Sequence, residues 1–167
     1  LPERLTAMHL TPDELMKIKP GLIFGNLSSY GSSGPDSAVP GYDATLQGRT
    51  GIMHVTGEPN GKPVRAGVSV LDMGAGMWLA IGVLAALVKR AETGLGSVVE
   101  TSLYETGASW VSYHLSAFQL SGKPSERFGA SHPAFGPYGL YQTLDGDICI
   151  GVGNDNIFSK LCVLLQR

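Results

Sequence analysis

The segment Val68-Ser69-Val70-Leu71-Asp72-Met73-Gly74-Ala75-Gly76 marks a change of hydrophobic pattern, and the fold class follows from it. Residues 68–71 are rich in valine, which predicts a short β-strand. The run from Met73 to Val88 has no charged residue and is long enough for a buried helix. A strand that leads directly into a helix is typical of an α/β fold, whose ligands bind at such junctions.

Asp72 is the last charged residue before this run, so its carboxylate is expected where the predicted strand gives way to the helix. The N–H groups and the dipole at a helix N-terminus stabilise an ionised carboxylate, and Gly74 and Gly76 would let a substrate approach the backbone. Asp is also a preferred N-cap residue. From the residues alone, Asp72 is either a catalytic carboxylate or a simple helix cap.

The composition excludes several classes of partner. The chain is 43% hydrophobic and 16% charged, as in a globular protein. Its net charge is -2, and Lys89-Arg90 is the only adjacent cationic pair, so no nucleic-acid partner is expected. The uncharged run is shorter than the roughly 20 residues of a membrane span, so a core helix is expected and no membrane partner.

The cysteines and histidines give no metal pattern. Cys149 and Cys162 have neither CxxC nor Cys/His spacing, and the histidines are scattered along the chain. No metal site is therefore expected. Reduced, buried thiols and the lack of a signal-peptide pattern at the first residues fit a cytoplasmic location.

Local patterns predict the other elements. Thr11-Pro12-Asp13-Glu14 combines an N-cap, a first-turn proline and a capping glutamate, so a helix should begin at Thr11 and end before Pro20. Ser102 and Glu105 also fit a capping box, which gives Glu105 a structural role. The long helix should end at Thr93-Gly94. Further helices are expected over residues 41–50, 105–120 and beyond Asn154, and strands over residues 22–27, 98–103, 138–143 and 148–152. The turn Leu144-Asp145-Gly146-Asp147 would join the last two strands into a hairpin.

A set of short motifs occurs in a fixed order along the chain. The motifs are Ser29-Tyr30-Gly31-Ser32-Ser33-Gly34-Pro35, Pro40-Gly41-Tyr42-Asp43, Gly51-Ile52-Met53-His54-Val55-Thr56-Gly57, Gly61-Lys62-Pro63-Val64-Arg65-Ala66-Gly67-Val68, Leu71-Asp72-Met73-Gly74-Ala75-Gly76, Ile81-Gly82-Val83-Leu84-Ala85-Ala86-Leu87 and Thr93-Gly94-Leu95-Gly96. This order resembles that of the family III CoA-transferases over nearly the whole chain. Residues 53–57 and 63–65 most resemble members that use dicarboxylic acids such as succinate.

The resemblance implies a Rossmann-like large domain, a smaller α+β domain and an interlocked homodimer. The chain is similar to the middle of such a protein. Residues 1–123 would belong to the large domain, residues 124–137, which are rich in proline, would be a linker, and residues 138–167 would begin the small domain. The family's opening strand and early CoA-binding segment have no counterpart here, so this polypeptide alone is expected to bind CoA weakly and to be inactive.

Asp72 matches the family's catalytic aspartate. The resemblance implies that its carboxylate attacks the thioester of an acyl-CoA and forms a covalent aspartyl intermediate, from which CoA passes to a carboxylic acid. Coenzyme A is then a substrate, and no metal or redox cofactor is needed. Gly74 and Gly76 would offer backbone N–H groups to the developing oxyanion.

Tyr42 separates two branches of the superfamily. The related 2-methylacyl-CoA racemases have a His at the matching position, directly before Asp43, and use it to move a proton. A phenol is a poor proton shuttle at neutral pH, so CoA transfer is favoured. The alternatives are racemase-like or CoA-dependent lyase activity, or a non-catalytic member in which Asp72 only caps a helix.

Contacts to CoA are predicted for Gly31, Tyr42, Arg49 and Arg65. Gly31 lies in a loop rich in Ser and Gly that would cradle a ligand, and Tyr42 would line the site. Arg49 and Arg65 are cations close to the motifs and would meet CoA phosphates or a substrate carboxylate. Many family members have Arg where this chain has Val39, so one expected polar contact is missing.

Overall fold

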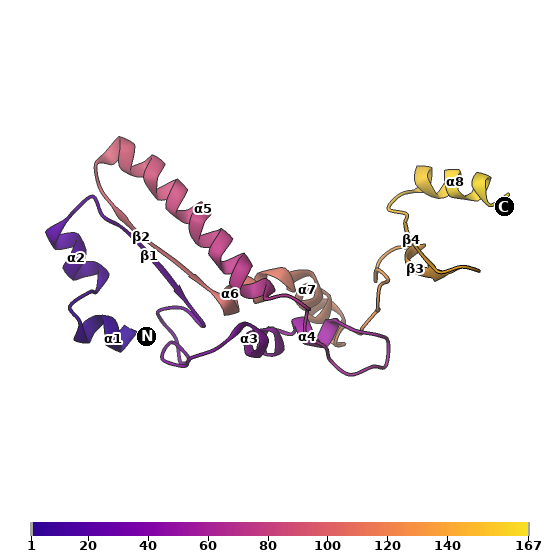
Figure 1. The fold of residues 1–167 in the computed structure, drawn as a ribbon, viewed down its shortest axis with the longest axis horizontal. Helices are drawn as coiled ribbons and strands as arrows, with labels where there is room; N and C mark the ends of the chain where they lie inside the picture. The colour runs from indigo at the N-terminus through magenta and orange to yellow at the C-terminus, as the bar shows by residue number, and fades with distance from the viewer. Residues whose placement is uncertain (1, 167) are drawn as a thin grey trace. The chain divides into compact units, whose positions relative to one another are not determined.

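Strands β1 (Ile23–Ser28) and β2 (Ser97–Ser102) pair in parallel in a computed structural model of the protein, which describes residues 2–166 (Figure 1). Ile23 pairs with Ser97 and Ser28 with Ser102, so both carboxyl ends lie at one edge. Parallel strands require a crossover, and helix α5 (Val70–Thr93) provides it while packing along both strands. The strands predicted over residues 22–27 and 98–103 are confirmed, each with a shift of one residue. The fold is mixed α/β.

Helix α5 begins earlier than the sequence pattern predicts. It already contains Leu71, so the strand predicted for residues 68–71 is wrong. Leu71 is fully buried and forms the hydrophobic core with Leu46, Ala75 and Leu103. A helix brings Leu71 and Ala75, four positions apart, onto one face, and this shared burial outweighs the β propensity of the valines. At its other end α5 stops as predicted, with Gly94 as the left-handed C-cap.

The prediction of a buried helix holds for only one face of α5. Strands β1 and β2 and the neighbouring helices cover that face and leave the opposite face without a packing partner among residues 2–166. The helix has 24 residues, more than the uncharged run, and by length and composition alone it is apolar enough to cross a membrane. The exposed apolar side chains include Met73, Met77, Ile81, Leu84 and Val88.

Two of the neighbouring helices pack against α5. Helix α3 (Asp43–Thr50) starts after the extended N-cap Tyr42, two residues later than predicted, and α4 (Ile52–Val55) is a single turn. Helix α6 (Leu103–Trp110) follows β2 directly and packs against α3 and α5. The prediction of a single helix over residues 105–120 is wrong. The backbone of Val111, whose side chain is buried, leaves helical geometry, and a separate helix α7 (Ser112–Ser121) begins after it.

The N-terminal helices are α1 (Pro2–Ala7), which the sequence did not predict, and α2 (Pro12–Ile18). The capping box of α2 is confirmed: the Glu14 N–H donates to Thr11 Oγ1, and the Glu14 carboxylate accepts from the Thr11 N–H, both at 3.3 Å. Hydrogen bonds from the Thr11 hydroxyl and from His9 to this carboxylate lower the pKa of Glu14 to about 2.

The described residues group into two units. The first contains the residues up to Met53 together with Arg65–Lys123, and the second contains His54–Val64 and the residues from Pro124 onward. The predicted hairpin and helix in the second unit are confirmed. They are the antiparallel strands β3 (Tyr138–Gln142) and β4 (Asp147–Gly151), followed by α8 (Asp155–Leu164), which Asn154 caps. The sequence did not predict that His54–Val64 belongs with these elements.

Candidate active site around Asp72

Asp72 lies in the first turn of α5, two residues after the helix begins. Its side chain is exposed, and within residues 2–166 no hydrogen bond or ion pair reaches its carboxylate. The N-cap position belongs to Ser69, so the alternative in which Asp72 caps this helix is wrong. The carboxylate is therefore free for chemistry, beside the partial positive charge of the helix N-terminus.

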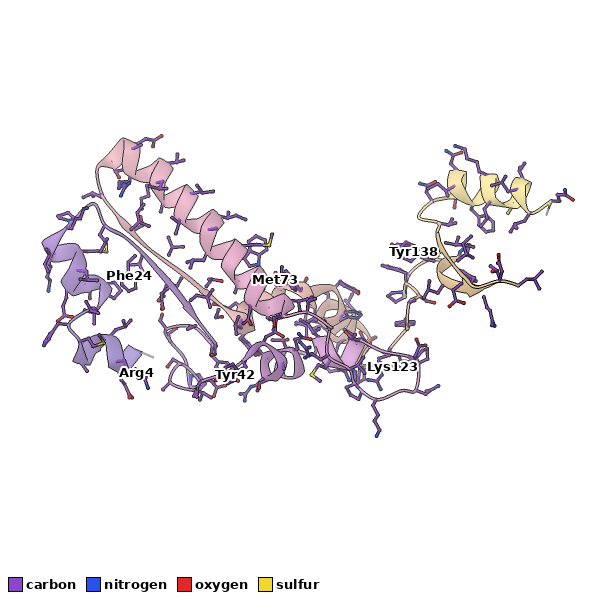
Figure 2. The ribbon with its side chains drawn as sticks, viewed as in Figure 1. Arg4, Phe24, Tyr42, Met73, Lys123 and Tyr138 are labelled. Atoms are coloured by element: carbon purple, nitrogen blue, oxygen red, sulfur yellow. The ribbon has the colours of Figure 1, made fainter. Side chains whose placement is uncertain are left out.

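The cap of α5 comes instead from Asp43, the first residue of α3. The backbone N–H of Leu71 donates to Asp43 Oδ2 at 2.7 Å, and the N–H of Asp72 donates to the same oxygen at 3.4 Å. These are the N–H groups that an N-cap side chain ordinarily satisfies, and the Ser69 side chain makes no such bond. Figure 2 labels Tyr42, which precedes Asp43 at the start of α3, and Met73, which follows Asp72 in the first turns of α5.

Asp43 is only 4% exposed, and a buried carboxylate is costly unless hydrogen bonds satisfy it. Its second oxygen, Oδ1, accepts from Gln47 Nε2 at 2.6 Å and lies 4.0 Å from Arg65 Nη1. Both oxygens thus have partners. Sequence reasoning missed Asp43 as a site residue, although the motif Pro40-Gly41-Tyr42-Asp43 contains it, because its backbone partners lie 28 and 29 residues further along the chain.

The oxyanion role predicted for the two glycines after Asp72 does not fit the helix. Their N–H groups lie within the helix, and even the Met73 N–H already donates to the carbonyl oxygen of Ser69 at 3.1 Å. Gly74 is buried against α6, where a Cβ would lie 2.5 Å from Trp110 ring atoms. Gly76 has open space around it. The prediction that these glycines donate to an oxyanion is therefore wrong, and Gly74 serves close helix packing.

Gly31 and Tyr42 line the same cavity, which has a volume of about 650 Å³ and opens beside the carboxyl end of β1. Gly31 has φ +96°, a conformation that favours glycine, and Tyr42 is 84% exposed. The charged side chains among the residues that line it are Asp13 and Glu100, with no Lys or Arg. Asp72 is not among these lining residues, so the cavity alone does not bring the predicted phosphate contacts together with the carboxylate.

The two predicted arginines already have partners in the first unit. Arg49 pairs with Asp36 and lies over the Tyr30 ring, 5.4 Å from its centroid. Arg65 approaches Asp43 and donates to the carbonyl oxygen of Gly67 at 3.3 Å. Both guanidinium groups are partly exposed, and their predicted contacts with CoA stay predictions.

Glu105 has a structural role, as the sequence predicts, but its carboxylate binds the Ser102 hydroxyl and not the Ser102 N–H that a full capping box uses. Its N–H donates to Ser102 Oγ at 3.1 Å, and Ser102 Oγ donates to its carboxylate at 2.7 Å. The hydroxyl therefore caps α6 and orients the glutamate. Across the described part of the chain, no three His, Cys, Asp or Glu side chains are grouped as a metal site would require.

Comparison with known proteins identifies the family. The model of CoA-transferase family III matches residues 1–167. The chain belongs to this family. The human succinyl-CoA:glutarate CoA-transferase is 33% identical over 99% of this chain and 38% of its own length. An acyl-CoA transferase of Fusarium pseudograminearum is 39% identical over 98% of this chain and 36% of its own. The acetyl-CoA:oxalate CoA-transferase of Acetobacter aceti is 35% identical over 90% of this chain and 39% of its own length.

Solved structures of family relatives have the same fold. A CaiB/BaiF family protein from Brucella suis superposes with a TM-score of 0.81 at 34% identity, covering 98% of this chain and 43% of its own. Rv3272 from Mycobacterium tuberculosis superposes with a TM-score of 0.83 at 29% identity, covering 99% of this chain and 44% of its own. The chain therefore spans about two fifths of the length of the relatives it matches.

Proposed function

We propose that this chain provides the nucleophile of an acyl-CoA:carboxylate CoA-transferase and that this nucleophile is the Asp72 carboxylate. The observation that supports it best is the free, exposed carboxylate in the first turn of α5, in a chain of CoA-transferase family III. An exposed carboxylate can reach an electrophile, and the N–H bonds to Asp43 hold the backbone beneath it.

The proposed reaction proceeds through acyl transfers at Asp72. Its carboxylate attacks the thioester carbonyl of the donor, the C–S bond breaks, and a mixed anhydride and CoA thiolate form. The thiolate then attacks the Asp72 carbonyl of the anhydride, which gives an aspartyl-CoA thioester and releases the donor acid as its carboxylate. The acceptor carboxylate attacks this thioester, its C–S bond breaks, and a second mixed anhydride and CoA thiolate form. The thiolate then attacks the acceptor carbonyl of that anhydride, which gives the acceptor acyl-CoA and restores the Asp72 carboxylate.

We propose a dicarboxylic acid as the acceptor. Relatives of this chain are named for succinyl-CoA and glutarate or for acetyl-CoA and oxalate, and glutarate and oxalate are both dicarboxylic acids. Arg65 lies near the first turn of α5 through its approach to Asp43, and it is our candidate partner for the second carboxylate. Arg49, Gly31 and Tyr42 are the proposed CoA contacts. No step of this reaction requires a metal.

The complete protein is proposed to be a cytoplasmic homodimer. The division into a Rossmann-like large domain up to residue 123 and a small domain from residue 138 belongs to the same proposal. Light scattering of the complete protein after size-exclusion chromatography tests the dimer, because a monomer mass at micromolar concentration would contradict it.

Chemical trapping tests the role of Asp72. The complete protein is incubated with succinyl-CoA and, separately, with acetyl-CoA, and hydroxylamine is then added. An activated Asp72 becomes a hydroxamate, because an anhydride or thioester is far more electrophilic than a resting carboxylate. Peptide mass spectrometry should place the modification on Asp72 only when acyl-CoA is present. Exchange of the α-proton of a 2-methylacyl-CoA with solvent, without trapping, would indicate a racemase instead.

A further inference from the structure

Gln47 makes a second set of contacts between α3 and the segment that leads into α5. It is fully buried, one helical turn after Asp43. Its Oε1 accepts a hydrogen bond from the backbone N–H of Ala66 at 2.9 Å, and its Nε2 donates to the carbonyl oxygen of Val68 at 3.4 Å. Nε2 also donates to Asp43 Oδ1 at 2.6 Å. The two side chains therefore act as one polar unit.

This pair holds both ends of residues 66–72. Gln47 binds the backbone of Ala66 and Val68, and Asp43 binds that of Leu71 and Asp72. Residues 66–69 form no helix or strand, so no regular backbone ladder sets their path. Hydrogen bonds are directional, whereas the apolar packing of Leu71 is not. The bonds from α3 therefore set where the first turn of α5 lies.

We propose that Asp43 and Gln47 are positioning residues that place the Asp72 carboxylate for CoA transfer, an inference that rests on the proposed role of Asp72 as nucleophile. Both side chains are buried and bind the backbone of the segment that ends at the nucleophile, so they act through its position and not on the substrate. A displacement of about 1 Å at a reacting group can lower the rate about 100-fold. Loss of the pair is expected to cause such a displacement.

The test compares four variants of the complete protein with the wild type. Asp43→Ala removes both acceptor oxygens, whereas Asp43→Asn keeps one oxygen for the N–H groups of Leu71 and Asp72. Gln47→Met keeps the volume of the side chain without its hydrogen bonds. Ser69→Ala is the matched control, because Ser69 occupies the N-cap of the same helix and its side chain makes no capping bond.

Three quantities are measured with succinyl-CoA as donor and glutarate as acceptor. They are the single-turnover rate of hydroxylamine trapping at Asp72, the split between KM and kcat, and the hydrogen exchange of a peptide that contains Leu71 and Asp72. Asp43→Ala should trap about 100-fold more slowly per folded molecule, with KM for succinyl-CoA nearly unchanged and faster exchange. The trapping rate should fall by a smaller factor in Asp43→Asn and Gln47→Met, and in Ser69→Ala it should equal that of the wild type.

Trapping in Asp43→Ala at the wild-type rate would overturn the positioning role but not the proposed function, because Asp72 would then react without the cap from Asp43. A rate that falls only in proportion to the unfolded fraction would also overturn it, since that result describes stability and not position. If Asp43→Ala does not fold, wild-type trapping in both Asp43→Asn and Gln47→Met has the same meaning. Absence of trapping in the wild type would instead overturn the proposed function itself.

Discussion

The carboxylate of Asp43 accepts the backbone N–H of Asp72, 29 residues further along the chain. One aspartate thus fixes the backbone while the other keeps its carboxylate exposed and without a partner among the described residues. Because the cap comes from a separate helix, the Asp72 side chain is not needed to bind the N–H groups of Leu71 and Asp72. This division of roles is what we expect of a nucleophile that must be both accessible and well placed.

Replacing Asp72 by Asn should abolish CoA transfer and trapping while the fold remains. The amide is a poor nucleophile, and the variant loses only the favourable charge at the helix N-terminus, worth about 0.3–1 kcal/mol. Transfer between succinyl-CoA and glutarate is measured alongside thermal unfolding. Mass spectrometry must exclude deamidation to Asp. Transfer near the wild-type rate in an intact Asp72→Asn protein would rule out Asp72 as the nucleophile.

Replacing Asp72 by Glu keeps the carboxylate but moves it by about 1 Å or more. The rate should fall about 100-fold, and trapping should still occur at position 72. Comparing the kcat of this variant with that of Asp72→Asn separates position from chemistry. Transfer by Asp72→Asn as fast as by Asp72→Glu, with both rates well above the uncatalysed reaction, would show that the carboxylate itself is not required.

Local signals in the sequence predicted much of the fold. The capping residues Thr11 and Glu14, the C-cap Gly94 and the cap Asn154 each act within a few positions, so their patterns located helix ends correctly. The turn at residues 144–147 likewise predicted the hairpin of β3 and β4. Position 72 was predicted to lie at a helix start for the same reason, since the uncharged run begins directly after it.

What the sequence could not provide depends on tertiary contacts. Residues 68–71 have strand-forming valines, but the burial of Leu71 with Ala75 makes the end of that segment helical. No local pattern pairs Asp43 with backbone groups 28 and 29 residues away. The packing of Gly74 on Trp110 also joins residues that are distant in the sequence. For that reason Gly74 was predicted to face the substrate, although it serves helix packing.

The capping box of α2 predicts a dependence on pH. Because hydrogen bonds lower the pKa of Glu14 to about 2, its contribution to stability is present above its ordinary value and is lost as the pH falls toward 2. Thr11→Ala removes the hydroxyl donor and should return the pKa of Glu14 toward that ordinary value. NMR titration of the Glu14 carboxyl carbon measures the change. An unaltered midpoint in the variant would contradict the assigned cause.

Tyr42 should be dispensable as an acid or base. Its side chain is 84% exposed, and the proposed acyl transfers need no proton shuttle at this position. Tyr42→Phe keeps the aromatic ring proposed to contact CoA and removes only the hydroxyl, so it should transfer CoA at a rate within about twofold of the wild type. Steady-state kinetics with succinyl-CoA and glutarate measure this. A loss of several powers of ten would instead assign the phenol a direct role in proton transfer.

Gly74 and Gly76 form a matched pair that tests the packing of α5 on α6. A methyl group at position 74 would lie 2.5 Å from Trp110 ring atoms, so Gly74→Ala should destabilise the complete protein by about 1–3 kcal/mol. Position 76 has open space, and Gly76→Ala should stabilise the helix by about 0.5–1 kcal/mol. Denaturant unfolding gives both values.

Trp110→Ala completes a double-mutant cycle with Gly74→Ala. Removing the indole vacates the space that the new methyl group needs, so Gly74→Ala should cost much less in this background than in the wild type. A coupling energy near zero would show that the indole is not what excludes a side chain at position 74. Equal unfolding free energies for Gly74→Ala and Gly76→Ala would contradict the close packing altogether, and would return Gly74 to consideration as a residue that faces the substrate.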